Sequence, residues 1–211
     1  MGQKVNPLGF RVGEFSDWKA RWFADSKNFR RYLLADLQLR RLLLSRLKNV
    51  GVTDVVIERL PKAMVIRIFV TRPGMVIGRG GAGVEELKEF IKKSMTFPPD
   101  KLDLDIQEVR EPELSARLVA ARIASELERR LPARRVMTRA MERVMNAGAA
   151  GVKVMLAGRI GGAEIARRQK LHLGSVPTQT LRADIDYAHI PALLKRGYVG
   201  VKVWIHKKEK K

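Results

Sequence analysis

The stretch from residue 72 to residue 84, R-P-G-M-V-I-G-R-G-G-A-G-V, constrains the fold of this chain more than any other feature. It holds five of the 17 glycines, between an apolar run and a helical pattern. Because glycine reaches positive φ and carries no Cβ, such a cluster lets a backbone turn sharply and approach another molecule closely. The free N–H groups at the start of the following helix favour a phosphate there.

One motif in this stretch is that of dinucleotide-binding enzymes. Gly78, Gly80 and Gly83 fit G-x-G-x-x-G, and Asp103 follows about 20 residues later, as that motif requires. The motif needs a strand that runs directly into its first glycine. Here Pro73 precedes that glycine by only five positions, which leaves too few residues for a typical strand of about five or six. The dinucleotide interpretation is therefore the weaker one.

The second motif is I-G-x-x-G-x-x-(I/V), which resembles the nucleotide-clamping loop of KH domains. Pro73 suits the first position of a short helical turn before the loop. Arg79 adds charge where a phosphate backbone would pass. The sequence therefore predicts a KH loop that contacts single-stranded RNA, through Arg72, Ile77, Gly78, Arg79, Gly80 and Gly81.

The charge of the chain indicates a polyanionic partner. The 211 residues carry a net charge of +20, and residues 112–211 hold 21 Lys and Arg against 8 Asp and Glu. Metabolic enzymes seldom carry such an excess, whereas proteins that neutralise phosphates do. The chain has no cysteine, which excludes disulfides and thiolate metal sites. No run approaches the roughly 18 apolar residues of a membrane span, so no membrane contact is expected.

The pattern of the first half predicts the order helix, strand, strand, helical turn, loop, helix, strand, which is that of a type II KH fold. The expected helices span residues 28–49 and 84–94, and the expected strands span 52–60, 63–70 and 102–107. Pro61 and Lys62 form the hairpin turn, and residues 97–100 end the second helix. Leu33, Leu37, Leu44 and Leu47 are expected to form the buried stripe of the long helix. Trp18 and Trp22 either stack on bases or fasten the preceding segment to this domain.

The second half predicts two helices followed by β structure. The helices span residues 113–130 and 133–147, with Pro132 between them, and the strands cover 152–156, 181–190 and 199–205; residues 163–173 fit helix and strand equally well. In the second helix Val136, Met137, Ala140, Met141, Val144 and Met145 form an apolar face. Arg135, Arg139 and Arg143 recur every four residues on the opposite side, where they offer a line of charge to a phosphate strand.

No catalytic or metal site is legible. Asp184 and Asp186 share one face of an expected strand, but charge partnership on a basic surface explains them better than a metal. The three histidines are scattered, and no phosphate-binding P-loop motif is present. We therefore expect no enzyme activity, no cofactor and no small-molecule substrate.

Six motifs occur in one order: GQKVNPLGFRVG, DWKARW, RPGMVIGRGG, GRIGGAEIAR, VPTQTLRADIDY and GVKVWI. Together they closely resemble the bacterial-type third protein of the small ribosomal subunit, over nearly the whole chain. The resemblance implies an α+β protein, in which a type II KH domain with a three-stranded sheet is followed by a C-terminal α/β domain of two helices on a mostly antiparallel sheet. The expected boundaries are a basic arm at 1–16, the KH domain at 17–111, the C-terminal domain at 112–207 and a disordered tail at 208–211. The arm is expected to become ordered on a partner.

The same resemblance implies a structural role in the head of the subunit, beside the channel through which messenger RNA enters. The implied partners are small-subunit ribosomal RNA, messenger RNA, and the tenth and fourteenth proteins of the head. Candidate messenger contacts are Arg134, Arg135, Arg139 and Arg143, and candidate ribosomal RNA contacts are Lys4, Asn6, Arg11, Arg159, Arg167 and Arg168. Thr138 and Glu142 stand where close relatives often have basic residues, which predicts weaker strand parting.

Two functions of different class remain open at this stage. The first is a ribosomal component of the cytoplasm, or of an organelle. The alternative is a free-standing KH regulator that binds single-stranded RNA.

Overall fold

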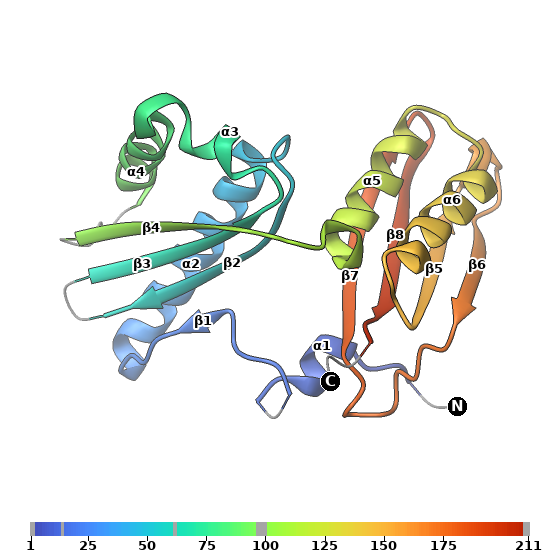
Figure 1. Cartoon of the computed structure of the whole chain (residues 1–211), viewed down its shortest axis with the longest axis horizontal. Coiled ribbons are helices and arrows are strands. Elements are labelled where there is room, and N and C mark those ends of the chain that lie inside the picture. Colours follow the sequence, from blue (N-terminus) through green and yellow to red (C-terminus); the bar gives the residue numbers. More distant parts are fainter. Residues whose placement is uncertain (1–2, 14, 61–62, 96–100, 209–211) are drawn as a thin grey trace. The chain divides into compact units, whose positions relative to one another are not determined.

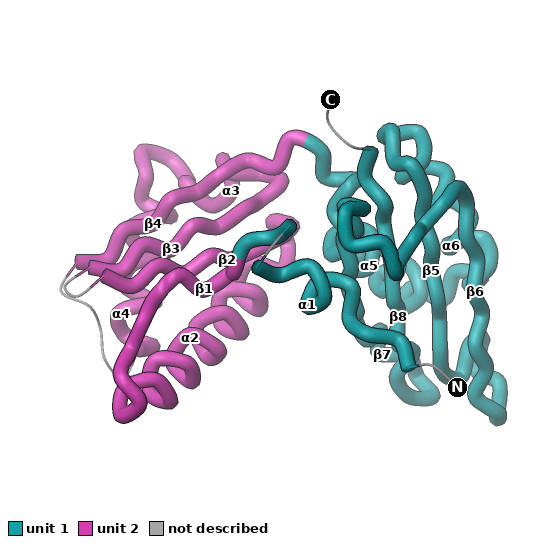
Figure 2. Tube along the Cα trace, turned by 90° about the horizontal axis from the view of Figure 1, so that it is seen from below, with its two compact units in different colours: residues 1–17, 111–211 teal, residues 18–110 magenta. Residues whose placement is uncertain are grey.

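The computed structural model describes residues 3–13, 15–60, 63–95 and 101–208. The chain forms two compact units, one of residues 18–110 and one that joins residues 1–17 to residues 111–211 (Figure 2). The hairpin turn expected at 61–62, the helix break expected at 97–100 and most of the tail expected at 208–211 lie outside the described residues.

The first unit has the element order of a type II KH domain. Its elements are β1 (Ala20–Arg21), α2 (Ser26–Arg46), β2 (Val52–Arg59), β3 (Ala63–Val70), α3 (Pro73–Ile77), the short 3-10 turn η1 (Arg79–Gly81), α4 (Ala82–Ser94) and β4 (Lys101–Glu108). The sheet order is β1-β2-β3-β4, with β2 and β3 antiparallel and the two outer pairs parallel. The predicted order is confirmed. The sheet has one strand more than expected, because β1 adds a two-residue edge.

The core of this unit follows from alternation on the central strands. Ile57 and Ile66 face each other across β2 and β3 and are fully buried, and the helices α2 and α4 cover that face with Leu43 and Ile91. Each large side chain buried in this way contributes about 1.5–3 kcal/mol to stability.

The predicted stripe of α2 is partly wrong. Leu33 and Leu37 are 40% and 44% exposed, and the helix instead buries Asp36, Leu39 and Leu43. Leucines recur on more than one side of this helix, so periodicity alone does not choose the buried face. The sheet chooses it by packing against the side that carries Leu39 and Leu43.

The second unit is a four-stranded antiparallel sheet with two helices on one face. Its elements are α5 (Ala116–Glu128), α6 (Ala133–Asn146), β5 (Gly151–Gly158), β6 (Arg167–Gly174), β7 (Ile185–Leu194) and β8 (Gly197–His206), with short 3-10 turns η2 (Pro112–Leu114) and η3 (Ile160–Gly162). The strand order is β6-β5-β8-β7. Figure 1 shows α5 and α6 on the same side of this sheet, as expected from the sequence.

Two expectations for this unit change in detail. The ambiguous segment 163–173 forms β6 from Arg167 onward, and the strand expected at 181–190 begins only at Ile185. The apolar face predicted for α6 is confirmed, because Val136, Met137, Ala140, Met141 and Val144 are all buried against the sheet and α5.

The N-terminal arm packs on the second unit instead of standing free. Asn6 caps the short helix α1 (Pro7–Arg11) by accepting a hydrogen bond from the Leu8 N–H at 3.0 Å, and α1 lies against β7. The Arg11 side chain is only 4% exposed and donates to the carbonyls of Ala183 at 2.8 Å and Thr180 at 2.6 Å. These bonds satisfy carbonyls of the segment before β7 and tie the arm to it.

Candidate nucleic-acid interface

The glycine loop joins two helices at a tight corner. Helix α3 begins with Pro73 at its first turn and ends at Ile77. The next residue, Gly78, caps it with a φ of 69° and a ψ of −178°, a region open essentially to glycine alone. Gly83 makes the closest approach, since a Cβ there would lie 2.4 Å from the carbonyl oxygen of Val76. No strand runs into Gly78, because β3 ends at Val70 and α3 intervenes. The loop therefore has KH geometry and not that of a dinucleotide site.

The tip of this loop is open to solvent. Arg72, Ile77, Gly78, Arg79 and Gly80 are exposed, and Gly81 is half-buried. Beside the loop Met75 is 59% exposed and Ile77 is 40% exposed, which gives bases an apolar surface next to the two arginines. Met75 was not among the loop residues predicted from the sequence. Its position inside the glycine motif, next to the buried Val76, was the feature that could have indicated its exposure. The structure brings all the predicted loop residues together, and their contact with RNA stays a prediction.

Helix α6 presents a second basic surface. Its buried face fixes the helix on the sheet, and Arg134, Arg135, Arg139 and Arg143 are all exposed on the other side. None of the four forms an ion pair with any residue that the structure describes. An open depression of about 540 Å³ lies on this face. Its lining consists of Pro132, Arg134, Arg135, Thr138, Arg139 and Glu142.

Arg143 belongs to the exposed row but not to the depression. The first three arginines therefore form one site, and the fourth extends it along the helix. Glu142 places a carboxylate in the same depression, beside the three arginines. These four contacts with messenger RNA remain predictions.

The candidate ribosomal RNA residues divide into exposed and internally engaged side chains. Lys4, Arg167 and Arg168 are exposed. Arg159 is exposed but donates from Nε to the carbonyl of Ala163 at 2.9 Å, which holds the turn after β5. Arg11 is buried, and that burial lowers its pKa against the opposing effect of Asp184. Its guanidinium therefore stabilises the folded arm. Asn6, the last of the candidate residues, is exposed.

The two tryptophans of the DWKARW motif differ in role. Trp22 packs against Phe29 and Tyr32, and its indole N–H donates to Asp36 at 2.7 Å. It fastens the segment before α2 to the first unit. Trp18 is 67% exposed and Phe23 is 92% exposed, so these two aromatics remain open for stacking.

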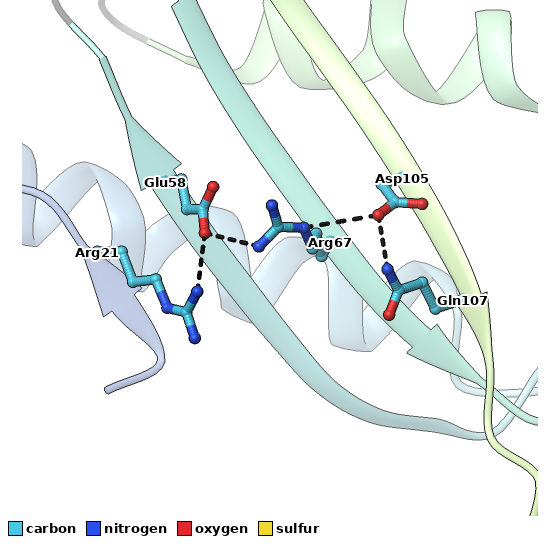
Figure 3. A network of polar contacts seen from close by, with 5 residues as sticks. All are labelled: Arg21, Glu58, Arg67, Asp105 and Gln107. Atoms are coloured by element: carbon cyan, nitrogen blue, oxygen red, sulfur yellow. Dashed lines mark hydrogen bonds and ion pairs between the residues drawn. The ribbon is translucent and has the colours of Figure 1, made fainter. Parts of the chain in front are cut away.

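The face of the KH sheet away from its helices carries an ion network (Figure 3). Arg67 on β3 donates to Glu58 on β2 at 2.6 Å and pairs with Asp105 on β4 at 3.6 Å, while Arg21 and Gln107 join at the two ends. The two arginines of this network are therefore paired with carboxylates, which disfavours a phosphate backbone beside them.

Of the two aspartates singled out in the sequence, Asp184 comes just before β7 and Asp186 lies on β7. Asp186 accepts a hydrogen bond from the Ala116 N–H at 2.8 Å and so caps the first turn of α5. Within the described residues no three His, Asp or Glu side chains are placed to hold a metal ion, and no helix there is long and apolar enough to cross a membrane.

Comparison with known proteins agrees with this geometry. The family model for the KH domain matches residues 38–114, and the model described as "Ribosomal protein S3, C-terminal domain" matches residues 123–205. The protein named small ribosomal subunit protein uS3 in Persephonella marina is 48% identical over 210 residues, which cover 100% of this chain and 92% of the relative. Proteins of the same name in Caldicellulosiruptor saccharolyticus and Hydrogenovibrio crunogenus are 47% and 46% identical over 98% and 100% of this chain.

The chain belongs to the ribosomal protein S3 family. The resemblance drawn from the six motifs is thereby confirmed, and the protein is a component of the small ribosomal subunit and not an enzyme. Membership in this family implies ribosomal partners and a role in translation. The alternative of a free-standing KH regulator is not favoured, because the similarity extends over both units and not over the KH domain alone.

Proposed function

We propose that this chain binds ribosomal RNA in the head of the small subunit and that α6 contacts incoming messenger RNA beside the channel through which it enters. The observation that carries the proposal is the row of exposed arginines on α6, none of which forms an ion pair with a residue that the structure describes. A rigid helix, locked by its buried methionine face, holds three guanidinium groups around one open depression. Arginine forks donate bidentate hydrogen bonds to phosphates, so this site suits a backbone and not a particular base.

The messenger proposal is tested by reversing charge at Arg135 and Arg139 in reconstituted ribosomes. We expect initiation on messengers with structured leaders to fall more than initiation on unstructured ones. The control reverses two exposed cations elsewhere, Lys92 and Arg129, and so lowers the net charge equally. Equal losses on both messenger types would reduce α6 to an architectural role.

We propose further that the KH loop holds unpaired ribosomal RNA. Replacing Arg79 and Gly80 with aspartate places two negative charges at the exposed tip. Gly80 has a φ of 63°, where Asp and Asn are tolerated best among residues other than glycine. The matched control replaces the same two residues with asparagine, which makes equal demands on the backbone without the charge. RNA crosslinking at the loop is expected to disappear in the aspartate variant and to persist in the asparagine control; crosslinking unchanged by aspartate would contradict the proposal.

The exposed apolar residues of α2 are the argument for a contact with a neighbouring protein of the head. Phe29, Leu33, Leu34 and Leu37 are between 40% and 50% exposed on one helix. We propose that this side of α2 meets a neighbouring head protein, the tenth or fourteenth of the usual assembly. Replacing Leu33 and Leu37 with glutamine should weaken retention of that neighbour in assembled subunits, and retention unchanged by the replacement would exclude this surface.

We place the protein in ribosomes of the cytoplasm, in line with its bacterial relatives. Sedimentation of a lysate through sucrose at two salt concentrations tests this placement. We expect the chain to migrate with small subunits and full ribosomes at both. Recovery at the top of the gradient would withdraw the ribosomal RNA and messenger proposals together.

A further inference from the structure

The sheet of the second unit has one face covered by α5 and α6 and another that faces away from these helices, here called the uncovered face. Ile185 at the β7 edge of that second face is only 2% exposed, and α1 lies against β7. Register identifies the residues of the uncovered face, because directly paired residues of antiparallel strands share a face. Val152, Val154 and Leu156 pack against the helices, so the residues between them face the other way. One row across all four strands then consists of His172, Lys153, Trp204 and Tyr187, and the next consists of Lys170, Met155, Lys202 and His189.

This face carries several cations whose charge is not balanced by acidic residues of the described strands. Lys153, Arg168, Lys170 and Lys202 lie on it, and none of them forms an ion pair with any part of the chain that the structure describes. No strand residue on the face is Asp or Glu among those described, since Asp186 points to α5. The pKa of Lys153 is lowered, first by burial and then by the positive charges of Lys4 and Lys170. Among the described residues, such a surface therefore has no counter-ion.

The same face carries aromatic rings in the middle of the cations. The rings of Tyr187 and Trp204 lie 5.2 Å apart at 39°, and the Lys153 ammonium lies 5.2 Å from the centre of the Trp204 ring. Both rings are half-buried, so each keeps an accessible part. Burial also raises the pKa of the Tyr187 hydroxyl. An aromatic pair surrounded by unpaired lysines combines a surface for bases with a surface for phosphates.

The sheet of the KH unit provides the internal comparison. Its face away from the helices also carries cations, and Arg21 and Arg67 pair there with Glu58 and Asp105 (Figure 3). Acids of the same sheet therefore neutralise these two arginines. On the corresponding face of the C-terminal sheet no described strand residue is acidic, so its lysines have no such partner on the sheet.

We infer that the uncovered face of the C-terminal sheet is an RNA-binding platform, on which an unpaired base stacks at Trp204 and Tyr187 while Lys153, Lys170 and Lys202 hold the flanking phosphates. The inference rests on the proposed function, because it adds a third RNA contact to the KH loop and α6. It predicts a preference for single strands over duplexes, since bases within a duplex are already stacked.

The stacking part is tested with the full-length chain and a fluorescent single-stranded RNA of mixed sequence. Replacing Trp204 with leucine removes the ring but keeps an apolar side chain, and we expect the affinity to fall by roughly 5- to 150-fold, as loss of one stacked base predicts. Replacing Trp204 with phenylalanine should restore most of that affinity. A loss that is equal for duplex RNA, or no rescue by phenylalanine, would overturn the stacking role.

The phosphate part is tested through the salt dependence of the same affinity. Exchange of Lys170 and Lys202 for glutamine should reduce the slope of log K against log salt by about 1.4, the value for two phosphate contacts to a single strand. The control exchanges Lys92 and Lys93 on α4, which should leave the slope unchanged. If the slope of log K against log salt is the same in the Lys170/Lys202 variant and in the control, the phosphate contacts of the platform are contradicted.

These measurements are repeated in a chain that carries aspartate at Arg79 and Gly80 and glutamate at Arg135 and Arg139. Persistence of the Trp204 effect there supports the platform even if the loop and α6 fail as RNA sites. If only the replacements in the loop and in α6 lower the RNA affinity, and those of Trp204 and the lysines do not, the platform is overturned. The proposed function then stays intact. A photoreactive phenylalanine at the position of Tyr187 in assembled subunits should crosslink to RNA; crosslinking to protein alone would also overturn the inference.

Discussion

The buried carboxylate of Asp36 is expected to control the stability of the KH unit. Asp36 is 3% exposed and lies in the middle of α2. It accepts hydrogen bonds from Arg59 Nε at 2.9 Å, from the second guanidinium nitrogen of Arg59, and from the Trp22 indole at 2.7 Å. It thereby joins the segment before α2, the helix and strand β2.

Replacing Asp36 with asparagine keeps the shape of the side chain but removes its charge. The Arg59 side chain, 13% exposed and stacked over Tyr32, then stays buried without a counter-ion. Removing one partner of a buried pair costs about 3–5 kcal/mol, a large share of the 5–15 kcal/mol that stabilises a typical domain. The matched control is Glu89→Gln, which breaks an i, i+4 pair with Lys93 whose side chains are 70% and 79% exposed. We expect the control to cost no more than about 0.5 kcal/mol.

Native-state hydrogen exchange on the full-length chain measures this difference unit by unit. Peptides from residues 18–110 should lose about two to three and a half orders of magnitude of protection in the Asp36 variant, since each 1.4 kcal/mol is a factor of ten. Peptides from residues 111–206 should keep theirs. A loss below tenfold in the first unit, or an equal loss in both units, would refute the reasoning. Arg59→Met added to the Asp36 variant should recover part of the stability, because it removes the stranded charge.

Three further predictions concern the loop, α5 and α6. Gly83→Ala should disrupt the corner between α3 and α4, because its Cβ would lie 2.4 Å from a backbone oxygen, whereas the Cβ of Gly80→Ala meets nothing and should cost only about 1 kcal/mol; amide spectra of the loop distinguish the two. Asp186→Ala should destabilise the second unit by about 1–2 kcal/mol and Asp186→Asn by less, as measured by exchange of α5 amides; equal effects would exclude a role for the charge. Glu142→Gln should raise the affinity of α6 for single-stranded RNA about twofold to fivefold at low salt, and an unchanged affinity would show that Glu142 does not oppose the phosphate.

Much of the fold follows from local patterns in the sequence. Strand β3 has the predicted bounds, because its alternation of buried and half-buried residues is strict and both ends have turn signals. Pro73 indicated the helical turn α3, which decided between two glycine motifs that share the same residues. The apolar face of α6 was also legible, because its six members recur at helical spacing and its arginines fall on the opposite side.

The candidate sites differ in how far they could be predicted from the sequence. The glycine loop and the arginine row each lie within one short segment, so spacing alone predicts that their residues lie together. The platform on the C-terminal sheet escaped the sequence analysis, because Lys153, Lys170 and Trp204 come from three strands up to 51 residues apart and meet only through register. The burial of Arg11, which was predicted to contact RNA, also depends on distant segments. Three of its carbonyl partners lie 167 to 172 residues away, in the segment before β7, so the residues near it in the sequence did not indicate burial.

The sequence by itself determined the KH order of the first domain and the basic character of the protein, because glycine spacing, helical periodicity and net charge are properties of contiguous residues. The family followed from the resemblance of the six motifs, each of which is also a contiguous segment. The tertiary structure alone decided which leucines of α2 are buried, which arginines are engaged inside the protein, and which sheet face keeps its cations unpaired. Those outcomes depend on pairing between distant segments. A short-range pattern does not record such pairing, because the partner of each charge or apolar side chain is chosen by packing and register and not by its neighbours in the chain.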